Sequence, residues 1–242
     1  MTVEEGPTDA FVSDRVARKL AEPSPAPKLT VSWVRYQYQG HTDDALAEVS
    51  FTVPAGGCVA LTGPAGVGKS TLLRLLRGQL DPTSGAIRYD EQDTWRTDPA
   101  LRHRIALVPT RGLLSDTTLA RNIAQDRPSA QHAEMVEAAR LAGVLGFVDG
   151  LTDGFNTRLG ADGAALTAGQ RRRILIARAL LMKPDVLLMD EPTSGLVSRE
   201  RHELIGELCQ LATSHTMVLA TQDPLVIALA DEVVELARPT AR

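Results

Sequence analysis

Apolar and polar residues alternate in two stretches near the start of the sequence. The first, residues 29–33, has Leu29, Val31 and Trp33 as its apolar positions, and residues 49–53 repeat the pattern. Successive side chains of a strand point to opposite faces, so this alternation predicts a strand with one buried face. We therefore expect two strands here, each packed on one side against a core.

Short uninterrupted apolar runs follow at four places. Strands in the middle of a parallel sheet are covered on both faces, and continuous apolar runs are typical of them. Between the runs, apolar residues recur at helical spacing, beginning with the segment that starts at Lys69. The runs are 58–61, 105–108, 186–189 and 217–220, a short strand is expected at 87–89, and further helical patterns lie at roughly 130–142, 170–181 and 199–212.

This order of elements predicts an α/β fold with a parallel central sheet, a small antiparallel β layer and a helical insert. The insert begins at about residue 112 and, with the helix after it, extends to about 180. Residues 1–27 look separate, because Pro23, Pro25 and Pro27 form a stiff, non-helical link. We expect one domain over 28–242, preceded by this segment.

Composition narrows the choice of function. The 242 residues carry a net charge of −4 and are 43% hydrophobic, which suffices for a core and gives no reason to expect nucleic-acid binding. Charged residues interrupt every long apolar stretch, and the acidic start lacks a signal-peptide pattern. Cys58 and Cys209 fit no metal or redox spacing. We expect a cytoplasmic protein.

The segment GPAGVGKS, from Gly63 to Ser70, matches the phosphate-loop pattern G-x-x-x-x-G-K-[ST]. A predicted strand precedes it and a predicted helix follows, so backbone N–H groups and the helix N-terminus can face a phosphate. Lys69 is expected to reach the β- and γ-phosphates, and Ser70 to bind Mg²⁺. The expected nucleotide contacts are Gly63, Pro64, Ala65, Gly66, Val67, Gly68, Lys69, Ser70 and Thr71.

Two carboxylates, Asp190 and Glu191, end the apolar run at 186–189. Ligands bind at the carboxyl ends of the strands in open α/β sheets. Asp190 is therefore expected to hold Mg²⁺, with Glu191 directly after it. Strand-end charges are common by themselves, but a phosphate loop in the same chain makes a site the better interpretation.

Between these motifs lies LTAGQ, residues 166–170. With GPAGVGKS before it and DVLLMDEPTS after it, the chain resembles the nucleotide-binding domain of ATP-binding-cassette (ABC) proteins over about residues 29–236. The resemblance implies a P-loop NTPase core, ATP and Mg²⁺ as cofactors, and a helical subdomain over about 112–180. It also implies a dimer with another such domain, in which Thr167, Ala168, Gly169 and Gln170 cap the γ-phosphate of the partner's nucleotide.

The resemblance assigns further residues. It makes Glu191 the candidate that acts on the attacking water as a general base. Tyr38 lies where the family stacks adenine on an aromatic ring, although packing is its alternative role and Trp33 and Tyr36 are nearby. Of Arg171, Arg172 and Arg173, two are expected on a solvated helix face.

The chain departs from the family pattern at several site positions. Thr110 stands where a glutamine touches Mg²⁺, and Gln222 where a histidine contacts the γ-phosphate. Val197 stands in place of an aspartate that faces the partner, and Ala161 in place of a common glutamate. A neutral Gln222 cannot carry the charge of a histidine, and Thr110 is shorter than glutamine. We therefore expect slow hydrolysis in the chain's own site.

The partners implied are a second ABC ATPase domain, with a heterodimer expected ahead of a homodimer, and the transmembrane domain of a transporter at the cytoplasmic face of the membrane. The segment 117–123 resembles the corresponding motif of exporters more than that of importers. Part of residues 1–27 resembles the segment that joins the membrane helices to the ATPase domain in exporters; the alternative is that residues 1–27 are a disordered tail. Three alternatives stay open: an importer subunit, a soluble ABC protein, and a regulatory subunit with little turnover. The sequence does not reveal the transported substrate.

Overall fold

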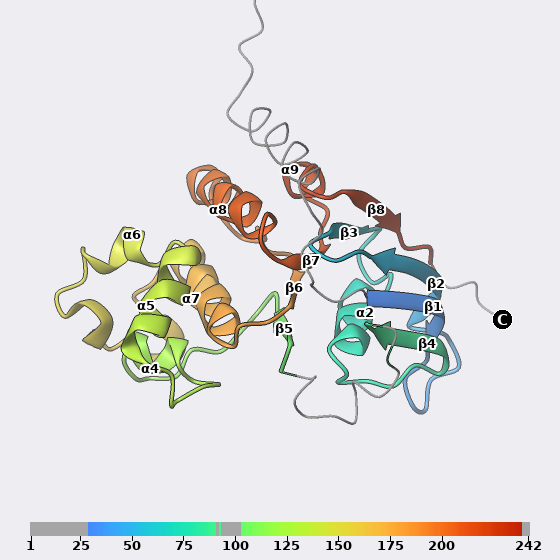
Figure 1. Ribbon diagram of the computed structural model, residues 1–242, viewed down its shortest axis with the longest axis horizontal. Coiled ribbons are helices and arrows are strands. Elements are labelled where there is room, and N and C mark those ends of the chain that lie inside the picture. Colours follow the sequence, from blue (N-terminus) through green and yellow to red (C-terminus); the bar gives the residue numbers. More distant parts are fainter. Residues whose placement is uncertain (1–28, 91, 93–102, 239–242) are drawn as a thin grey trace, which may run out of the picture.

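A parallel sheet of five strands crosses the centre of the molecule (Figure 1). The computed structural model describes residues 29–90, 92 and 103–238; the predicted segment 1–27 lies outside them. The strand order is β5-β6-β7-β3-β8. Their bounds are β3 (Cys58–Thr62), β5 (Ile105–Val108), β6 (Val186–Asp190), β7 (Thr216–Ala220) and β8 (Glu232–Glu235).

The four apolar runs are therefore confirmed as neighbouring parallel strands. The sequence did not indicate β8, because this edge strand has a glutamate at each end and a half-exposed valine between them. The α/β fold class is confirmed.

A second, antiparallel sheet has the order β2-β1-β4. It consists of β1 (Leu29–Tyr36), β2 (Leu46–Val53) and β4 (Ser84–Tyr89). The predicted alternation fails at Trp33, which is 66% exposed while Val34 is buried. A register shift between Val31 and Val34, with φ of 53° at Trp33, marks a β-bulge. The extra residue of a bulge reverses the faces of the side chains that follow.

Helices cover both faces of the parallel sheet, and those of the insert gather at one side of it (Figure 1). The predicted helices at 130–142, 170–181 and 199–212 are confirmed to within two residues at each end. No helix in the described part of the chain is both long and apolar enough to cross a membrane. The helices are α2 (Lys69–Leu76), α4 (Leu119–Ile123), α5 (His132–Leu141), α6 (Leu145–Val148), α7 (Ala168–Leu181), α8 (Ser198–Leu211) and α9 (Pro224–Ile227), with 3₁₀ turns at Gly154–Asn156 and Ala161–Gly163.

The alternation of side chains along β6 divides the core in two. Leu187 and Met189 pack with α7 and α8, whereas Val186 and Leu188 pack with α2 and the antiparallel sheet. Asp190 continues the second series, so the period of two directs its carboxylate toward α2. The sheet thereby aims a carboxylate at the phosphate loop.

Candidate functional site

The phosphate loop joins β3 to α2 through three glycines with positive φ. These angles are 127° at Gly63, 79° at Gly66 and 100° at Gly68. A Cβ added to Gly63 would lie 2.7 Å from the Leu236 carbonyl oxygen, and one added to Gly68 would lie 2.5 Å from that of Ala45. Glycine is therefore required at both positions by conformation and by space.

Lys69, the first residue of α2, folds back over this loop. Its Nζ donates to the carbonyl oxygens of Gly63 at 2.8 Å and Pro64 at 3.3 Å, and lies 3.9 Å from Glu191 Oε1. The side chain is buried. A buried ammonium whose carboxylate neighbour is 3.9 Å away, beyond hydrogen-bond distance, favours a further anion beside it, which is what a phosphate-binding lysine requires.

Ser70 and Asp190 meet across the gap between α2 and β6. Ser70 Oγ donates to Asp190 Oδ2 at 2.7 Å, although 120 residues separate them. The other oxygen, Asp190 Oδ1, is buried and has no hydrogen-bond partner among the described residues. An orphaned carboxylate oxygen beside a serine hydroxyl is an oxygen donor set of the kind Mg²⁺ takes, so the site fits that cation.

Glu191 follows at the end of β6 in a left-handed conformation. Its φ is 45°, and its backbone N–H donates to Ala220 O at 2.8 Å. Burial raises the pKa of the Glu191 carboxyl, while the nearby Lys69 ammonium and the backbone N–H of Gln222 oppose that rise. A carboxylate with a raised pKa accepts a proton more readily near neutral pH, which suits a general base.

A pocket of about 390 Å³ brings most of the predicted residues together. The Tyr38 hydroxyl lies 3.2 Å from Thr71 Oγ1 and accepts a bond from Arg74, and the edge of Tyr36 packs on its ring. Gln222 Nε2 donates to Gly63 O at 3.2 Å. The lining residues are Tyr38, Ala45, Ala65, Gly66, Gly68, Lys69, Ser70, Thr71, Thr110, Asp190, Glu191 and Gln222.

Three predicted contacts do not line this pocket. Gly63 and Pro64 turn their carbonyl groups to Lys69, and the side chain of Val67 is buried in the core. Ala45, which was not predicted, lines the pocket because β2 begins beside the loop.

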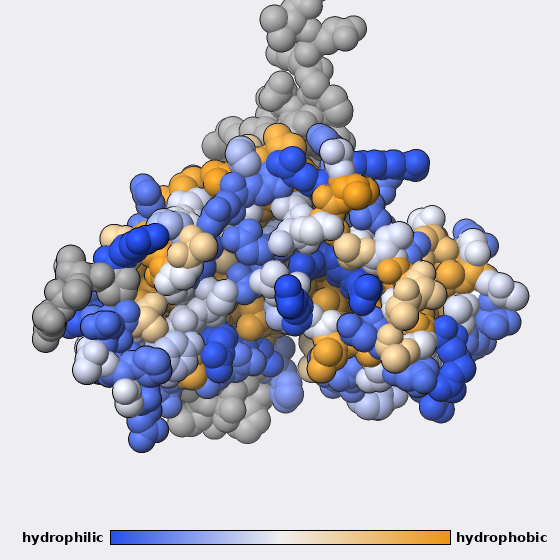
Figure 2. All heavy atoms as spheres, turned by 180° about the vertical axis from the view of Figure 1, so that it is seen from behind, coloured by the Kyte–Doolittle hydropathy of each residue, from blue (hydrophilic) through white to orange (hydrophobic). Residues whose placement is uncertain are grey.

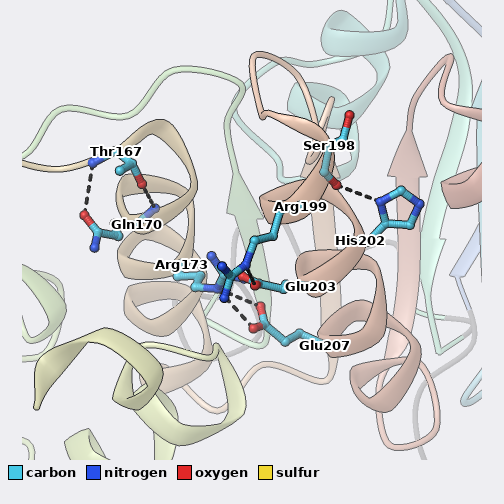
Figure 3. A network of polar contacts seen from close by, with 8 residues as sticks. All are labelled: Thr167, Gln170, Arg173, Ser198, Arg199, His202, Glu203 and Glu207. Atoms are coloured by element: carbon cyan, nitrogen blue, oxygen red, sulfur yellow. Dashed lines mark hydrogen bonds and ion pairs between the residues drawn. The ribbon is translucent and has the colours of Figure 1, made fainter. Parts of the chain in front are cut away.

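The segment 166–170 lies apart from that pocket, at the start of α7. Thr167 Oγ1 accepts the Gln170 backbone N–H at 3.1 Å, and Gln170 Oε1 accepts the Thr167 N–H at 3.0 Å (Figure 3). This reciprocal pair is a capping box, which fixes the first turn of the helix. Gly169 is buried, and a Cβ there would lie 2.7 Å from Glu200 Cδ.

The three arginines after this segment correct the expectation that two of them face solvent. Arg172 and Arg173 are both buried, and only Arg171 is partly exposed, with a side chain 37% accessible. Arg173 Nε donates to Glu207 at 3.0 and 3.1 Å, and its Nη2 to Glu203 at 3.3 Å, joining α7 to α8 (Figure 3). A run of three charged residues suggests a solvent-exposed face, but the long apolar stem of arginine lets the side chain be buried when its head group is hydrogen-bonded.

Arg172 points to the other side of α7. Its Nη1 donates to Pro109 O at 2.7 Å and its Nη2 to Thr110 O at 2.8 Å. Burial lowers the pKa of its guanidinium, and the charge of Asp190 opposes that change. No signal in the sequence pointed to this contact, which links positions 62 residues apart.

Asp223 is a further residue that the sequence analysis missed. It accepts hydrogen bonds from Thr193 Oγ1 at 2.7 Å and from the Arg201 guanidinium, with Nε at 2.6 Å. Burial alone would raise the pKa of Asp223, but the bonds from Arg201 and Thr193 outweigh it and lower the pKa to about 2. Asp223 thereby ties the segment carrying Gln222 to α8.

A larger groove of about 730 Å³ separates α2 and β5 from α7. Seen from behind, the surface is hollowed between the lobe of helices and the body that holds the sheets (Figure 2). Ser70 and Asp190 reach its wall, and Leu113 at its edge is 81% exposed. The groove thus borders the nucleotide pocket.

Comparison with known proteins places this geometry in a family. The family model described as ABC transporter matches residues 46–194. The chain is 37% identical over 191 residues to the ATP-binding cassette sub-family B member 6 of Rattus norvegicus, covering 78% of this chain and 23% of that protein. It is 38% identical over 216 residues to a multidrug efflux ATP-binding/permease protein of Mycobacterium tuberculosis, covering 88% of this chain and 18% of that protein.

A solved structure agrees. The structure of a bacterial Atm1-family ABC exporter with ATP bound superposes with a TM-score of 0.79 and 34% identity, covering 90% of this chain and 38% of that one. The chain thus spans between about a fifth and two fifths of the length of these proteins. With the family model matching more than half of its residues, the chain belongs to the ABC transporter family, of which it forms an ATP-binding, ATPase domain.

Proposed function

We propose that this chain binds Mg-ATP in the pocket between β3, α2 and β6, hydrolyses it slowly, and powers an exporter-type transporter. The observation that carries the proposal is the pairing of Ser70 with Asp190, whose other, buried oxygen has no hydrogen-bond partner among the described residues, in a pocket that Lys69 and Glu191 also line. The groups that hold metal, phosphate and attacking water are thereby gathered at one strand end.

Each residue has a distinct part in this proposal. Ser70 Oγ and Asp190 hold Mg²⁺, which supplies neutralising charge at the phosphates when it is bound. Lys69 leaves the loop carbonyl groups and contacts the β- and γ-phosphates. Glu191 positions the attacking water and accepts its proton. Tyr38, at the rim of the pocket beside Thr71, provides a face for adenine.

The proposal of slow turnover rests on what the other lining residues lack. Thr110 reaches the pocket with a short hydroxyl side chain, where it supplies at most a weak third oxygen ligand. Gln222 can donate hydrogen bonds to a phosphate but carries no charge, and it is engaged with Gly63. Mg-ATP should therefore bind well while charge developing in the transition state is poorly stabilised.

The proposed assembly contains two further partners. A second ABC ATPase domain would contribute its own phosphate loop opposite Thr167, Ala168, Gly169 and Gln170 of this chain, whose rigid capping box presents a helix N-terminus. Val197, 65% exposed at the start of α8, favours a different chain as that partner, because it brings an apolar side chain where the family has a carboxylate. A transmembrane domain would anchor the pair at the cytoplasmic face of the membrane.

The test is hydrolysis of Mg-ATP by the purified chain, with ATP binding measured in parallel. We expect tight binding, low turnover, and complete loss of that turnover in Glu191→Gln with binding retained. Gln222→His should raise turnover, because an imidazolium can stabilise the γ-phosphate. Fast turnover in the unaltered chain, or no gain in Gln222→His, would contradict the slow site. Binding with no turnover in any variant would favour a regulatory subunit.

A further inference from the structure

Arg172 joins the start of α7 to the loop that follows β5. Its two Nη groups donate to two consecutive carbonyl oxygens, those of Pro109 and Thr110, at 2.7 and 2.8 Å. A guanidinium is planar and presents its donors as a fixed fork, so two bonds to adjacent carbonyl groups hold their orientation as well as their position. Thr110, which lines the nucleotide pocket, is therefore fixed from outside that pocket.

The same loop is packed tightly against α7 at a second point. A Cβ added to Gly112 would lie 2.6 Å from Leu175 Cδ2, one turn after Arg172 on the helix. With one contact made by hydrogen bonds and another by close packing, the loop cannot shift without moving α7. The position of α7 and that of Thr110 are thus linked.

The positive charge of Arg172 also interacts with that of Asp190, the carboxylate proposed to hold the metal. Val108 pairs with Met189 in the parallel sheet, so the two carbonyl groups that Arg172 binds directly follow Val108, just as Asp190 directly follows Met189. Arg172 as a residue is only 5% exposed, and among the described residues its guanidinium bonds to two backbone carbonyl oxygens and not to a carboxylate. A buried charge that is not neutralised by a bonded partner acts on its neighbours with little screening.

We propose that Arg172 is a positioning residue for the nucleotide site: its fork fixes the Thr110 loop relative to α7, and its charge weakens the binding of a divalent cation at Asp190. The inference rests on the proposed function, since it assumes that Ser70 and Asp190 hold the metal of Mg-ATP. It assigns to one side chain two effects of opposite sign. Fixing the loop favours hydrolysis, whereas the charge makes the metal harder to bind.

Three variants separate the two effects. Arg172→Met removes the charge and the fork while keeping an unbranched stem. Arg172→Lys keeps the charge but offers a point donor that cannot hold both carbonyl groups. Arg171→Met is the matched control, because Arg171 is the preceding arginine on the same helix, is partly exposed, and bonds to Asp162, which does not line the pocket.

The first readout is Mn²⁺ binding in the presence of a non-hydrolysable ATP analogue, followed by electron paramagnetic resonance. We expect Arg172→Met to bind Mn²⁺ about three- to tenfold more tightly, because a nearby positive charge is gone. Arg172→Lys and Arg171→Met should stay within about twofold of the unaltered chain. A side chain with only a structural role would weaken metal binding or leave it unchanged, so a gain distinguishes the proposal.

The second readout is single-turnover hydrolysis of ATP at saturating metal. Arg172→Met and Arg172→Lys should both be slower by about tenfold or more, because a loop in the site loses its fixed geometry, and Arg171→Met should match the unaltered chain. Mn²⁺ affinity in Arg172→Met at or below that of the unaltered chain would overturn the role of the charge, and full activity in Arg172→Lys would overturn the role of the fork. No nucleotide-dependent Mn²⁺ binding by the unaltered chain would instead overturn the proposed function.

Discussion

Replacing Gly68 by alanine tests whether the phosphate loop is held by conformation alone or also by a neighbouring strand. Gly68 has φ of 100°, a conformation that costs an alanine about 1–2 kcal/mol. The added Cβ would also lie 2.5 Å from the carbonyl oxygen of Ala45, a backbone atom at the start of β2 that cannot swing away. Overpacking of this kind costs a further 1–3 kcal/mol, roughly. We therefore expect Gly68→Ala to lower the free energy of unfolding by about 2–5 kcal/mol.

Gly66→Ala is the control, because the two glycines share the conformational cost but not the contact. Gly66 has φ of 79°, and a Cβ there would have no atom within 4 Å. Gly66→Ala should therefore lower the free energy of unfolding by only about 1–2 kcal/mol. Urea denaturation followed by circular dichroism measures both values. Equal losses in the two variants would show that the contact with Ala45 carries no cost and would refute the reasoning.

The remaining predictions concern the rim of the pocket and the segment after β7. Tyr38→Ala should weaken ATP binding about tenfold or more in a fluorescent-nucleotide assay while Tyr38→Phe stays close to the unaltered chain, because stacking needs the ring and not the hydroxyl; equal losses in both would contradict this. Asp223→Asn should lower the free energy of unfolding by about 2 kcal/mol at pH 7, since the pKa of Asp223 is about 2 in the folded protein and 3.8 for an unperturbed aspartate. Because the pKa of Asp223 is lower in the folded than in the unfolded protein, its carboxylate stabilises the fold at pH values above about 3.8, and this stabilisation is lost as the pH falls toward 2. The free energies of unfolding of Asp223→Asn and of the unaltered chain should therefore converge near pH 2. A constant gap between them from pH 7 to pH 2 would contradict this assignment.

The central sheet and the phosphate loop could be predicted because both leave local marks. Continuous apolar runs identified four of the five parallel strands, and the phosphate loop stood out by the spacing of Gly63, Gly68 and Lys69. The strand-end position of Asp190 and the place of Ser70 in the phosphate loop made both of them expected metal ligands, and the structure brings their oxygens within 2.7 Å. Each of these predictions depended only on neighbours along the chain or on a general property of sheets.

What could not be predicted depends on contacts between distant segments. Arg172 and Arg173 are adjacent charged residues on a helix, and nothing local distinguishes them from Arg171, which is partly exposed. Their partners lie more than 30 residues away, at Thr110 and Glu207. The exposed Trp33 was missed for another reason, because a single extra residue in β1 is invisible to a count of alternating positions. The domain limits of 28–242 and 112–180 stay predictions.

The alternation of side chains in β6 has a consequence for how this site can change over evolutionary time. Since Val186 and Leu188 face the same way as Asp190, many exchanges of one apolar residue for another would preserve the direction of the carboxylate. Insertion or deletion of a single residue in the strand would instead reverse it and send Asp190 toward α8. The site therefore tolerates substitution of one apolar residue for another in β6, but it does not tolerate a change in the number of residues by one.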